Sequence, residues 1–591
     1  MPKAIVIGAG FGGIAAALRL RRKGYDVTIL DKQQQLGGRG MQYRRETPLG
    51  TFIHDAGPTV VTAKFLFDEL FEMFGKRRED YIEFRDIFPW YRIVFAGSSA
   101  RSRTVPVLPG AAGSAGHERD AHATPLPHFN YGGTLEQMEA EIARFEPADV
   151  EGFRRFLVHS KKIFDVGFTK LGAVPFHEPS MMFKAAPDLI RLESYKTVYG
   201  LAKKYLKSES LRRVFSFQPL LVGGNPFNTT SIYSLIFYLE REWGVQFAMG
   251  GTGAIVRGLE KLMREEGVEI LLGKEASKID VVPWTDHDAT QRLLGDGGPL
   301  LPRDPERRYF APKLSRWPPG NLFGVRRADG RTTLGDIVVA NADAPHVWQK
   351  LIDRKHHTLK SKVWMPRLKY SMGLFVLYFG TKRTYPEIAH HTIVLGETYR
   401  ELIDKLFDAR EIETKDLSVY LHRPTATDPS MAPPGCESFY VLVPVPNLQP
   451  KVRGTGVPPV VNHGRDAHAT QNDVPLTGEG VIDWAKYGDT FLAHVLDYLE
   501  RTILPGLRET IVDPFYVTPE HFRDNLNSVH GAGFSIQPIF SQSAYFRFHN
   551  KAPGIEGLYL VGAGTHPGAG MPGVLCSAKV LEELIPDVKT K

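Results

Sequence analysis

Four glycines near the start of the chain are spaced so that backbone atoms, rather than side chains, can approach a bound group. Residues 4–7 are apolar and lead into the sequence GAGFGG, which an Ala/Leu-rich segment follows. Strand, glycine turn and helix in this order place free N–H groups and a helix dipole beside a phosphate. We expect Gly8 to permit the tight turn, Gly10 to let a pyrophosphate approach, and Gly13 to let helix pack on strand. Gly12 lies in the same turn and is assigned to the same site.

An acidic residue follows this turn at the distance that a ribose-binding group requires. Residues 26–30 read as a second strand, and Asp31 comes directly after it, 18 positions beyond Gly13. A carboxylate there accepts hydrogen bonds from ribose hydroxyls, which completes the fingerprint of a dinucleotide site. Lys32 is placed in the same site. The alternative, a glycine turn that binds nothing, is disfavoured because all parts of the fingerprint occur in order.

Two further glycine-containing segments carry the same kind of signal. Gly38 and Arg39 lie shortly after Asp31, where a guanidinium can clamp a pyrophosphate from the other side. Near the other end of the chain, residues 557–574 read as a strand, a glycine loop and a helix, with Pro572 in the first helical turn. A domain that binds only NAD rarely continues in this way.

These segments resemble those of the flavoprotein amine-oxidase and carotenoid-desaturase superfamily. In that superfamily the C-terminal segment returns to the flavin, and its helix dipole faces the pyrimidine end of the isoalloxazine. Because the two signatures bracket the whole chain, the resemblance implies FAD as the cofactor. It also implies that the following residues belong to the FAD site: Gly57, Pro58, Thr59, Gly562, Gly564, Met571, Gly573 and Val574.

Five longer segments are similar to those of the bacterial-type phytoene desaturases. They are residues 52–62, 220–227, 239–245, 530–535 and 565–574. The resemblance covers the chain except for three insertions. It implies that phytoene or a close carotene precursor becomes a more conjugated polyene such as lycopene, in carotenoid biosynthesis. A flavin takes a hydride, a proton leaves the neighbouring carbon, and the reduced FAD passes electrons to oxygen or a membrane quinone.

The resemblance points to several candidates for the groups that would exchange protons. In the family, an acid and a base are suspected on the helix that enters an Ala-Ala-Pro step. Here Lys184 precedes that step and supplies the cation, but Met181 stands where the acid is expected. Glu178 or Asp188 could replace the acid, and Lys184 could instead be a charge that faces lipid.

Asp55 and His566, both in flavin-proximal motifs, are the other candidates for proton exchange. The alternative role for each is to hold loops by hydrogen bonds, and that role is favoured. A hydrocarbon substrate has no polar group that side chains could bind, so we expect an apolar tunnel to bind it by burying its surface.

Composition limits the class of protein. The chain has 591 residues, 42% hydrophobic and 24% charged, which is ordinary for a globular protein of two or three domains. Cys436 and Cys576 are the only cysteines, which excludes a disulfide framework and a four-thiolate metal site. We expect Cys576 to be a buried residue rather than a reactive thiol. The net charge of +7 does not by itself suggest nucleic acid, and none is expected as a partner.

We expect a cytoplasmic protein that associates peripherally with the cytoplasmic membrane. The first strand begins near residue 4, which leaves no room for a signal peptide, and no apolar run approaches the length of a membrane span. Residues 161–215 alternate basic with large apolar side chains, as in helices that lie on anionic lipid. A helical cap with a solvated basic face is the alternative. A substrate delivered from the bilayer favours the lipid surface.

The expected fold is α/β, with a discontinuous Rossmann-like FAD-binding domain, a mixed-sheet substrate domain and a helical membrane-associating region. The FAD-binding domain is expected at residues 1–60, 246–280, 321–345 and 541–591. The substrate domain is expected at 61–150 and 346–540, and the helical region at 151–245.

Three weakly patterned stretches are expected to be surface insertions: 99–127, 281–320 and 450–478. Two of them contain the same hexapeptide, RDAHAT, at 119–124 and 465–470. The repeated His and Asp could suggest metal binding, but a translated repeat inserted into loops is favoured, and no metal site is predicted.

Three other functions compete with this one. A related enzyme could desaturate or isomerise a different polyene. A flavin-free isoprenoid-binding carrier of the same fold would not need the retained glycines, Asp31 or Arg39. An NAD dehydrogenase would leave the C-terminal glycine loop unexplained.

Overall fold

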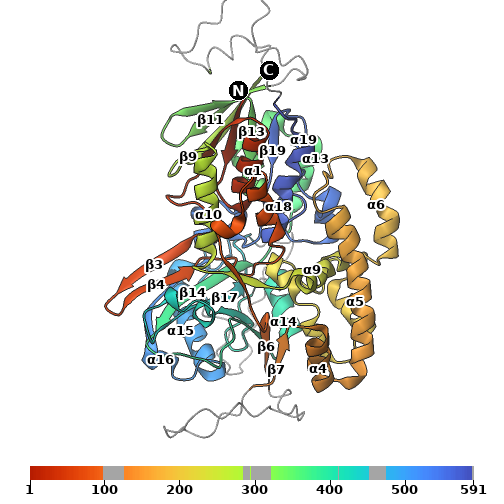
Figure 1. Ribbon diagram of the computed structural model, residues 1–591, viewed down its shortest axis with the longest axis vertical. Helices are drawn as coiled ribbons and strands as arrows, with labels where there is room; N and C mark the ends of the chain where they lie inside the picture. Colours follow the sequence, from red (N-terminus) through yellow and green to blue (C-terminus); the bar gives the residue numbers. More distant parts are fainter. Residues whose placement is uncertain (98–125, 284–292, 294–320, 410, 451–473, 589–591) are drawn as a thin grey trace, which may run out of the picture.

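The computed structural model describes residues 1–97, 126–283, 293, 321–409, 411–450 and 474–588. Two lobes, each built on one large sheet, lie one above the other in Figure 1, with a group of helices along one side. The N-terminus lies at the far end of the upper lobe (Figure 1).

The upper lobe contains a five-stranded parallel sheet with the order β19-β13-β1-β2-β9. All of β1 after Lys3 is buried, which is the continuous apolar pattern of a strand covered on both faces. Helices α1, α10 and α18 pack beside this sheet (Figure 1). The bounds are β1 (Lys3–Ile7), β2 (Asp26–Leu30), β9 (Glu269–Leu271), β13 (Ile337–Ala340), β19 (Leu558–Leu560), α1 (Phe11–Arg22), α10 (Thr252–Glu265) and α18 (Met571–Lys579).

The lower lobe contains a seven-stranded mixed sheet with the order β18-β14-β17-β16-β15-β6-β7. Only β15 and β6 pair in parallel; the other neighbours are antiparallel. The bounds are β6 (Tyr91–Ala96), β7 (His128–Tyr131), β14 (Gly373–Thr381), β15 (His391–Gly396), β16 (Val419–His422), β17 (Glu437–Val445) and β18 (Ile511–Val517).

Strand β14 shows how this sheet separates two environments. Phe375, Leu377 and Phe379 belong to the core that the sheet forms with helix α15 (Trp484–Thr502). The alternate residues of the same strand face a large cavity on the other side of the sheet.

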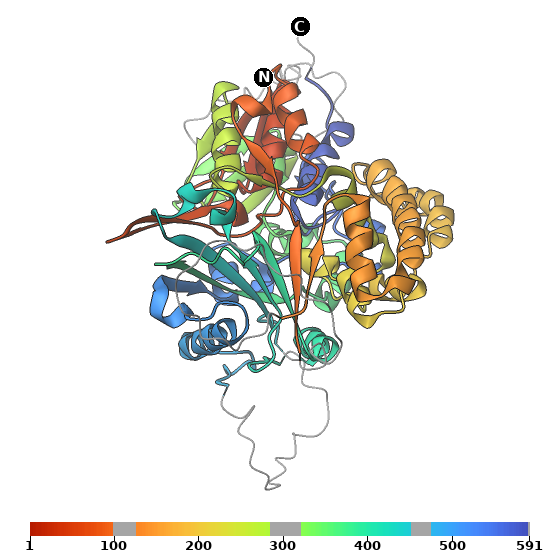
Figure 2. The same ribbon diagram turned by 60° about the horizontal axis from the view of Figure 1, so that its bottom comes forward.

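The helices along one side pack into a Phe-rich core that they share with one face of the lower sheet, and in it Phe153, Phe156, Phe215 and Phe237 contact one another. Figure 2 shows this group beside both lobes, and α6 lies at its outer edge in Figure 1. Among the described residues, no helix has both the length and the apolar character needed to cross a bilayer. The bounds are α4 (Leu135–Phe145), α5 (Val150–Phe164), α6 (Pro179–Arg191), α7 (Val198–Tyr205), α8 (Glu209–Val214) and α9 (Leu235–Trp243).

Shorter elements connect the lobes. The hairpin β3–β4 projects from the molecule near the lower sheet (Figure 1), and β10, β11 and β12 form a small antiparallel sheet. The bounds are β3 (Gln42–Thr47), β4 (Gly50–Asp55), α2 (Phe65–Glu72), β5 (Phe84–Asp86), β8 (Gln246–Ala248), β10 (Ala276–Pro283), β11 (Asn321–Arg327), β12 (Thr332–Gly335), α12 (Ala344–His346), α13 (Leu359–Trp364), α14 (Tyr399–Asp404), α16 (Leu507–Thr510), α17 (Pro519–Asp524) and α19 (Leu581–Leu584).

The predicted α/β class is confirmed, with one parallel sheet assembled from distant segments and a second, mixed sheet. The three predicted insertions, 99–127, 281–320 and 450–478, lie almost wholly outside the described residues, as do both copies of the repeat. Residues 281–283, however, belong to strand β10. The association of the helical region with a membrane stays a prediction.

Candidate functional site

The first glycine turn has the conformation that the spacing predicts. Gly8 has φ +94°, a region that side chains disfavour, and its N–H donates to the carbonyl of Leu30 at 2.7 Å. Gly10 is the N-cap of α1. A Cβ atom at Gly13 would lie 1.9 Å from the carbonyl oxygen of Gly8, so only glycine permits this approach.

Asn341, which no motif in the sequence singled out, joins the two ends of the chain. It follows β13 and donates from Nδ2 to the Gly8 carbonyl at 3.3 Å. A Cβ atom added at Gly12 or at Gly562 would lie 2.6 Å from its Oδ1. The N-terminal and C-terminal glycine turns therefore close around one amide side chain, and Gly564 lies in the second of these turns.

Asp31 lies at the end of β2, where the fingerprint predicts it, and lines the cavity. Its Oδ2 accepts a hydrogen bond from the N–H of Ala9 at 2.6 Å and its Oδ1 from Gln33 at 2.7 Å. Burial raises the pKa of Asp31, while these two bonds act in the opposite direction. Lys32 also lines the cavity, and its Nζ donates to the carbonyl of Asp524 at 2.6 Å.

Arg39 is the charged group in the predicted clamp, and part of its hydrogen-bonding capacity is unused. Nη2 donates to Ser528 Oγ at 3.2 Å, but the buried Nε has no hydrogen-bond partner within the described part of the chain. Burial lowers the pKa of Arg39, and the nearby Asp343 opposes that shift. Asp343 accepts from Ser535 Oγ at 2.5 Å and from the N–H of Val529 at 2.9 Å. An unpartnered guanidinium N–H beside a backbone turn suits an anionic pyrophosphate.

The segment 57–59 is held against the cavity by hydroxyl groups of the lower sheet. The Tyr440 hydroxyl donates to the Gly57 carbonyl at 2.9 Å, and Thr59 Oγ1 lies 2.9 Å from the hydroxyls of both Tyr420 and Tyr440. Gly57, Pro58 and Thr59 all line the cavity. A Cβ atom at Gly57 would lie 2.5 Å from the Arg39 carbonyl, so this segment packs directly on the clamp.

At the C-terminal turn, helix α18 begins at the cavity. Met571, Gly573 and Val574 line it, and Gly570 is the N-cap of the helix. Gly38 lines the cavity from the opposite segment, whereas Gly13, Gly562 and Gly564 lie behind the lining. Two helix N-termini, a carboxylate and a free guanidinium N–H thus surround one space, and this set of groups fits FAD.

The cavity has a volume of about 560 Å³. We call the part that these groups surround the FAD seat, and the apolar part into which it continues the apolar arm. The arm lies between the helical side and the face of the lower sheet opposite to α15, and Met182 and Leu189 of α6 also line the cavity. Its walls include Phe217, Leu220, Leu221, Ile232, Leu235, Met372, Leu374, Val376, Leu395 and Leu442.

Glu240, on α9, lines this cavity, although its side chain is almost fully buried. It lies in the segment 239–245 that carried the resemblance, but was not predicted as a site residue. The hydroxyls of Tyr91 and Tyr131 each donate to one of its carboxyl oxygens at 2.8 Å. Burial raises the pKa of Glu240 to about 7, with the hydrogen bonds acting against that shift.

The three proposed proton-exchanging residues lie in three different environments. Lys184 is exposed on α6 and is not among the residues that line the cavity. His566 lines the cavity, packs against Phe176 with the ring centres 4.9 Å apart, and has its pKa lowered to about 4 by burial. Its imidazole is therefore neutral near pH 7.

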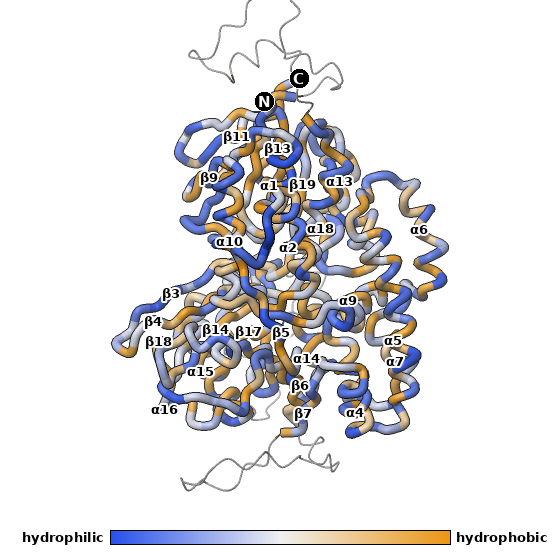
Figure 3. Tube along the Cα trace, viewed as in Figure 1, coloured by the Kyte–Doolittle hydropathy of each residue, from blue (hydrophilic) through white to orange (hydrophobic). Residues whose placement is uncertain are grey.

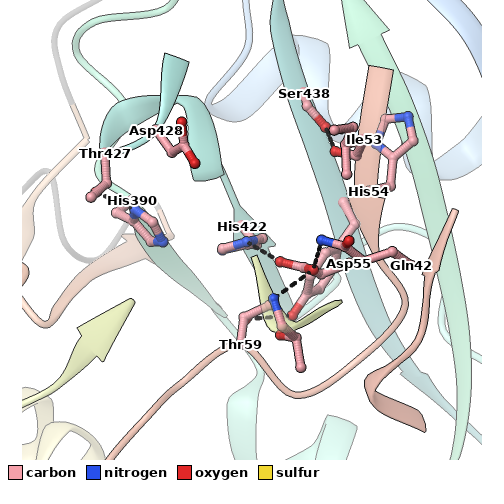
Figure 4. A network of polar contacts seen from close by, with 12 residues as sticks. Gln42, Ile53, His54, Asp55, Thr59, His390, His422, Thr427, Asp428 and Ser438 are labelled. Carbon is pink, nitrogen blue, oxygen red and sulfur yellow. Dashed lines mark hydrogen bonds and ion pairs between the residues drawn. The ribbon is translucent and has the colours of Figure 1, made fainter. Parts of the chain in front are cut away.

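Asp55 does not line the cavity and instead joins several segments (Figure 4). Its Oδ1 accepts from the N–H of Thr252, at the start of α10, and from Gln42 Nε2, each at 2.8 Å. Its Oδ2 lies 3.7 Å from His422 Nε2. These contacts are those of a residue that holds segments together, the alternative role considered for it. Cys576 is buried, and burial raises its pKa to about 12.

Comparison with known proteins gives consistent results. Residues 11–298 match the model of the flavin containing amine oxidoreductase family. The chain is 38% identical to the phytoene desaturase (lycopene-forming) of Pseudescherichia vulneris, over 99% of each chain. It is 38% identical to that of Pantoea ananas, over 99% of this chain and 100% of the relative. It is 35% identical to the phytoene desaturase (neurosporene-forming) of Rhodobacter capsulatus, over 99% of this chain and 94% of the relative.

Solved structures share the fold at low identity. An oxidoreductase from Methanosarcina mazei has a TM-score of 0.53 at 14% identity, covering 98% of this chain and 100% of the other. Cyclohexylamine oxidase from Brevibacterium oxydans has a TM-score of 0.52 at 13% identity, covering 99% of each. The cofactor is FAD, as predicted. The chain belongs to the bacterial-type phytoene desaturases, which are FAD-dependent oxidoreductases acting on CH–CH bonds.

Proposed function

We propose that this protein desaturates phytoene, or a closely related carotene precursor, to a more conjugated polyene such as lycopene. The observation that carries the proposal is the single cavity in which the FAD seat continues into a long apolar arm. When bound, FAD supplies an acceptor for a hydride. The walls of the arm can bind a hydrocarbon by removing its surface from water, which gains about 25 cal/mol of free energy per Å² of apolar area buried.

Each part of the seat has a proposed role. Asp31 accepts hydrogen bonds from ribose hydroxyls, and Arg39 donates to the pyrophosphate through its unpartnered Nε. The glycine turns let backbone approach the same group. His566 is neutral and packed on Phe176, so its proposed role is to shape the cavity beside the flavin rather than to carry a charge.

The substrate is proposed to enter from a membrane at α6. Met182 and Leu189, seven residues apart on α6, line the cavity, whereas Phe183 and Ile190 beside them are 78% and 67% exposed. Phe540, which also lines the cavity, is 51% exposed. In Figure 3, apolar positions recur along α6 at the edge of the molecule. An apolar rim around a cavity mouth lets a hydrocarbon pass from lipid without crossing water.

Charges near α6 suit an anionic surface. Lys184 and Arg191 are exposed on the same helix, whereas Lys204 on α7 pairs with Glu193 at 2.8 Å. We propose that the protein lies peripherally on the cytoplasmic membrane and passes electrons from reduced FAD to oxygen or a quinone. Assays without oxygen, with and without added quinone, separate these two acceptors.

The test is conversion of phytoene by the purified, flavin-loaded protein in liposomes, followed by pigment analysis. We expect absorption bands of a longer conjugated polyene with the parent protein. Leu442→Trp, which fills the apolar arm away from the glycine turns, should keep its flavin and lose conversion. Gly12→Val should lose both, because its side chain would meet Asn341. A flavin-loaded parent that leaves phytoene unchanged but converts another polyene would overturn the choice of substrate.

A further inference from the structure

Three histidines pack together behind Tyr420, which is part of the cavity wall. His391 begins β15, His422 ends β16 directly opposite it in the strand register, and His390 precedes β15. All three are buried, with at most 5% of the side chain exposed. The centres of their rings lie 4.5, 4.9 and 5.2 Å apart.

Each imidazole keeps a nitrogen without a partner. His390 Nδ1 lies 2.7 Å from Thr427 Oγ1. His391 Nδ1 lies 2.6 Å from the Tyr420 hydroxyl and 3.4 Å from His422 Nδ1. Within the described residues, the buried Nε2 atoms of all three histidines make no hydrogen bond, nor does the buried Oδ2 of Asp55. His422 Nε2 faces Asp55 Oδ2 at 3.7 Å, beyond hydrogen-bond distance, so these buried atoms lack the hydrogen bonds that polar groups in a protein interior normally make.

The three buried imidazoles have the chemistry of a metal site, because imidazole nitrogens are common ligands of divalent transition-metal ions. The hydrogen bonds at Nδ1 of His390 and His391 hold these two rings in place. Asp55, held by Thr252 and Gln42, supplies an oxygen 3.7 Å from His422 Nε2 (Figure 4).

We propose that His390, His391 and His422 bind one divalent transition-metal ion of the zinc type, with Asp55 next to His422. One nitrogen from each ring can be chosen so that all three lie within 4.8 Å of one another. Imidazoles bound at about 2.1 Å to one ion place their ring centres about 4.5–5.5 Å apart, which is the separation found here. Small ring rotations then bring the nitrogens into contact with the ion.

The ion has a structural consequence for the cavity. It ties the start of β15 to the end of β16 in the lower sheet, next to Asp55 at the end of β4. His391 contacts the Tyr420 hydroxyl, which in turn contacts Thr59 in the cavity wall. The ion therefore positions the wall segment 57–59 without touching the cavity itself.

The experiment measures metal in the protein as it is made in cells. Because the cluster is buried, Zn²⁺ or Co²⁺ is supplied in the growth medium, and the flavin-loaded protein is purified without chelator. We expect about one ion per chain by elemental analysis. The cobalt form should show the visible absorption of four-coordinate Co²⁺ at wavelengths beyond the flavin bands. A parent protein that contains flavin but less than about a tenth of an equivalent of either ion would overturn the proposal, since an ordered water would then fill the site.

Variants locate the ion. His391→Gln and His422→Gln should each lower the metal content at least tenfold, whereas His356→Gln, on a histidine outside the cluster, should leave it unchanged. Flavin content and circular dichroism report whether each variant folds. A folded His391→Gln protein with the metal content of the parent would contradict the assignment. If both cluster variants fail to fold, the parent's cobalt spectrum decides, because nitrogen coordination changes its bands from those of the hydrated ion.

Discussion

At Gly12 a single added carbon atom would meet three segments of the chain. Its Cβ would lie 2.6 Å from Asn341 Oδ1 and 3.4 Å from both the Gly562 Cα and the Val574 carbonyl oxygen. The glycine is therefore needed for contact between the two ends of the chain as well as for approach to a phosphate. Binding of FAD and packing of the N- and C-terminal segments depend on the same atoms.

The ribose contact of Asp31 can be tested directly. Losing a charge-assisted hydrogen bond costs about 1.5–3 kcal/mol, so Asp31→Ala should weaken FAD binding about tenfold or more. The variant also leaves the N–H groups of Ala9 and Gln33 unpaired, and Asp31→Asn controls for that loss. Flavin content after dialysis and titration of the apoprotein measure the effect. Unchanged affinity in both variants would contradict the assigned role.

Glu240 should make stability depend on pH in a defined direction. Its pKa is about 7 when folded and about 4.5 when exposed, so the folded protein binds more protons between these values. Stability must then fall as pH rises from about 4.5 to 7, by about 3 kcal/mol for a shift of this size.

Replacing Glu240 by glutamine, an uncharged residue of the same shape, removes this contribution to the pH dependence of stability. Glu240→Gln should unfold at a temperature that declines less between pH 5 and pH 8 than that of the parent, as measured by thermal melts. Tyr91→Phe, which removes one donor to the carboxyl group, should steepen the decline instead. Parallel curves for the parent and Glu240→Gln would show that the carboxyl group does not titrate in this range.

Residues with a local pattern could be predicted, and those placed by the fold could not. Asp31 and Arg39 stand at fixed distances from a glycine turn, so the sequence alone predicts them. Asn341 simply follows an ordinary strand, and Glu240 lies on an amphipathic helix where an acid usually faces water. The buried histidines at 390–391 and 422 meet only because β15 and β16 pair, which no spacing along the chain reveals.

At the scale of elements, the side chains of β14 alternate between the two faces of the sheet, so that one set packs in the core and the other lines the cavity. Leu374, Val376 and Tyr378 line the cavity, while their neighbours pack on α15. The sequence predicts a fully apolar strand here, but not which face meets a helix and which faces substrate. That distinction depends on the position of α15, more than a hundred residues later in the chain.

Helix α6 should govern contact with lipid. Phe183→Ser with Ile190→Ser removes two exposed apolar side chains at the cavity mouth, and burying each in lipid is worth about 1.5–3 kcal/mol at most. We expect binding to liposomes to weaken at least tenfold in sedimentation assays, with unchanged flavin content. Val158→Ser, at an exposed apolar position on α5, should have little effect. Equal binding of the double variant and the parent would place the membrane contact elsewhere.

At the scale of the whole molecule, the predicted insertions offer a test of what the fold requires. Deletion of residues 455–475, of which only Val474 and Pro475 belong to the described part of the chain, should leave flavin content and melting temperature nearly unchanged. Shortening a loop changes the free-energy cost of closing it by less than about 1 kcal/mol. Soluble yield, flavin absorbance and thermal melts measure the result. Loss of flavin would show that this stretch contributes to the folded core.

The order of strands in the upper sheet limits when the protein can first hold its cofactor during synthesis. β1 pairs with β13, and β13 pairs with β19, only about 30 residues before the end of the chain. At about 5–20 residues per second, the first glycine turn leaves the ribosome roughly half a minute to two minutes before its C-terminal partner. During that interval the seat is incomplete and the apolar face of α1 lacks α18. The FAD site therefore cannot be complete until residues 558–574 have been synthesised, and a nascent chain interrupted before residue 558 should be captured by chaperones rather than by flavin.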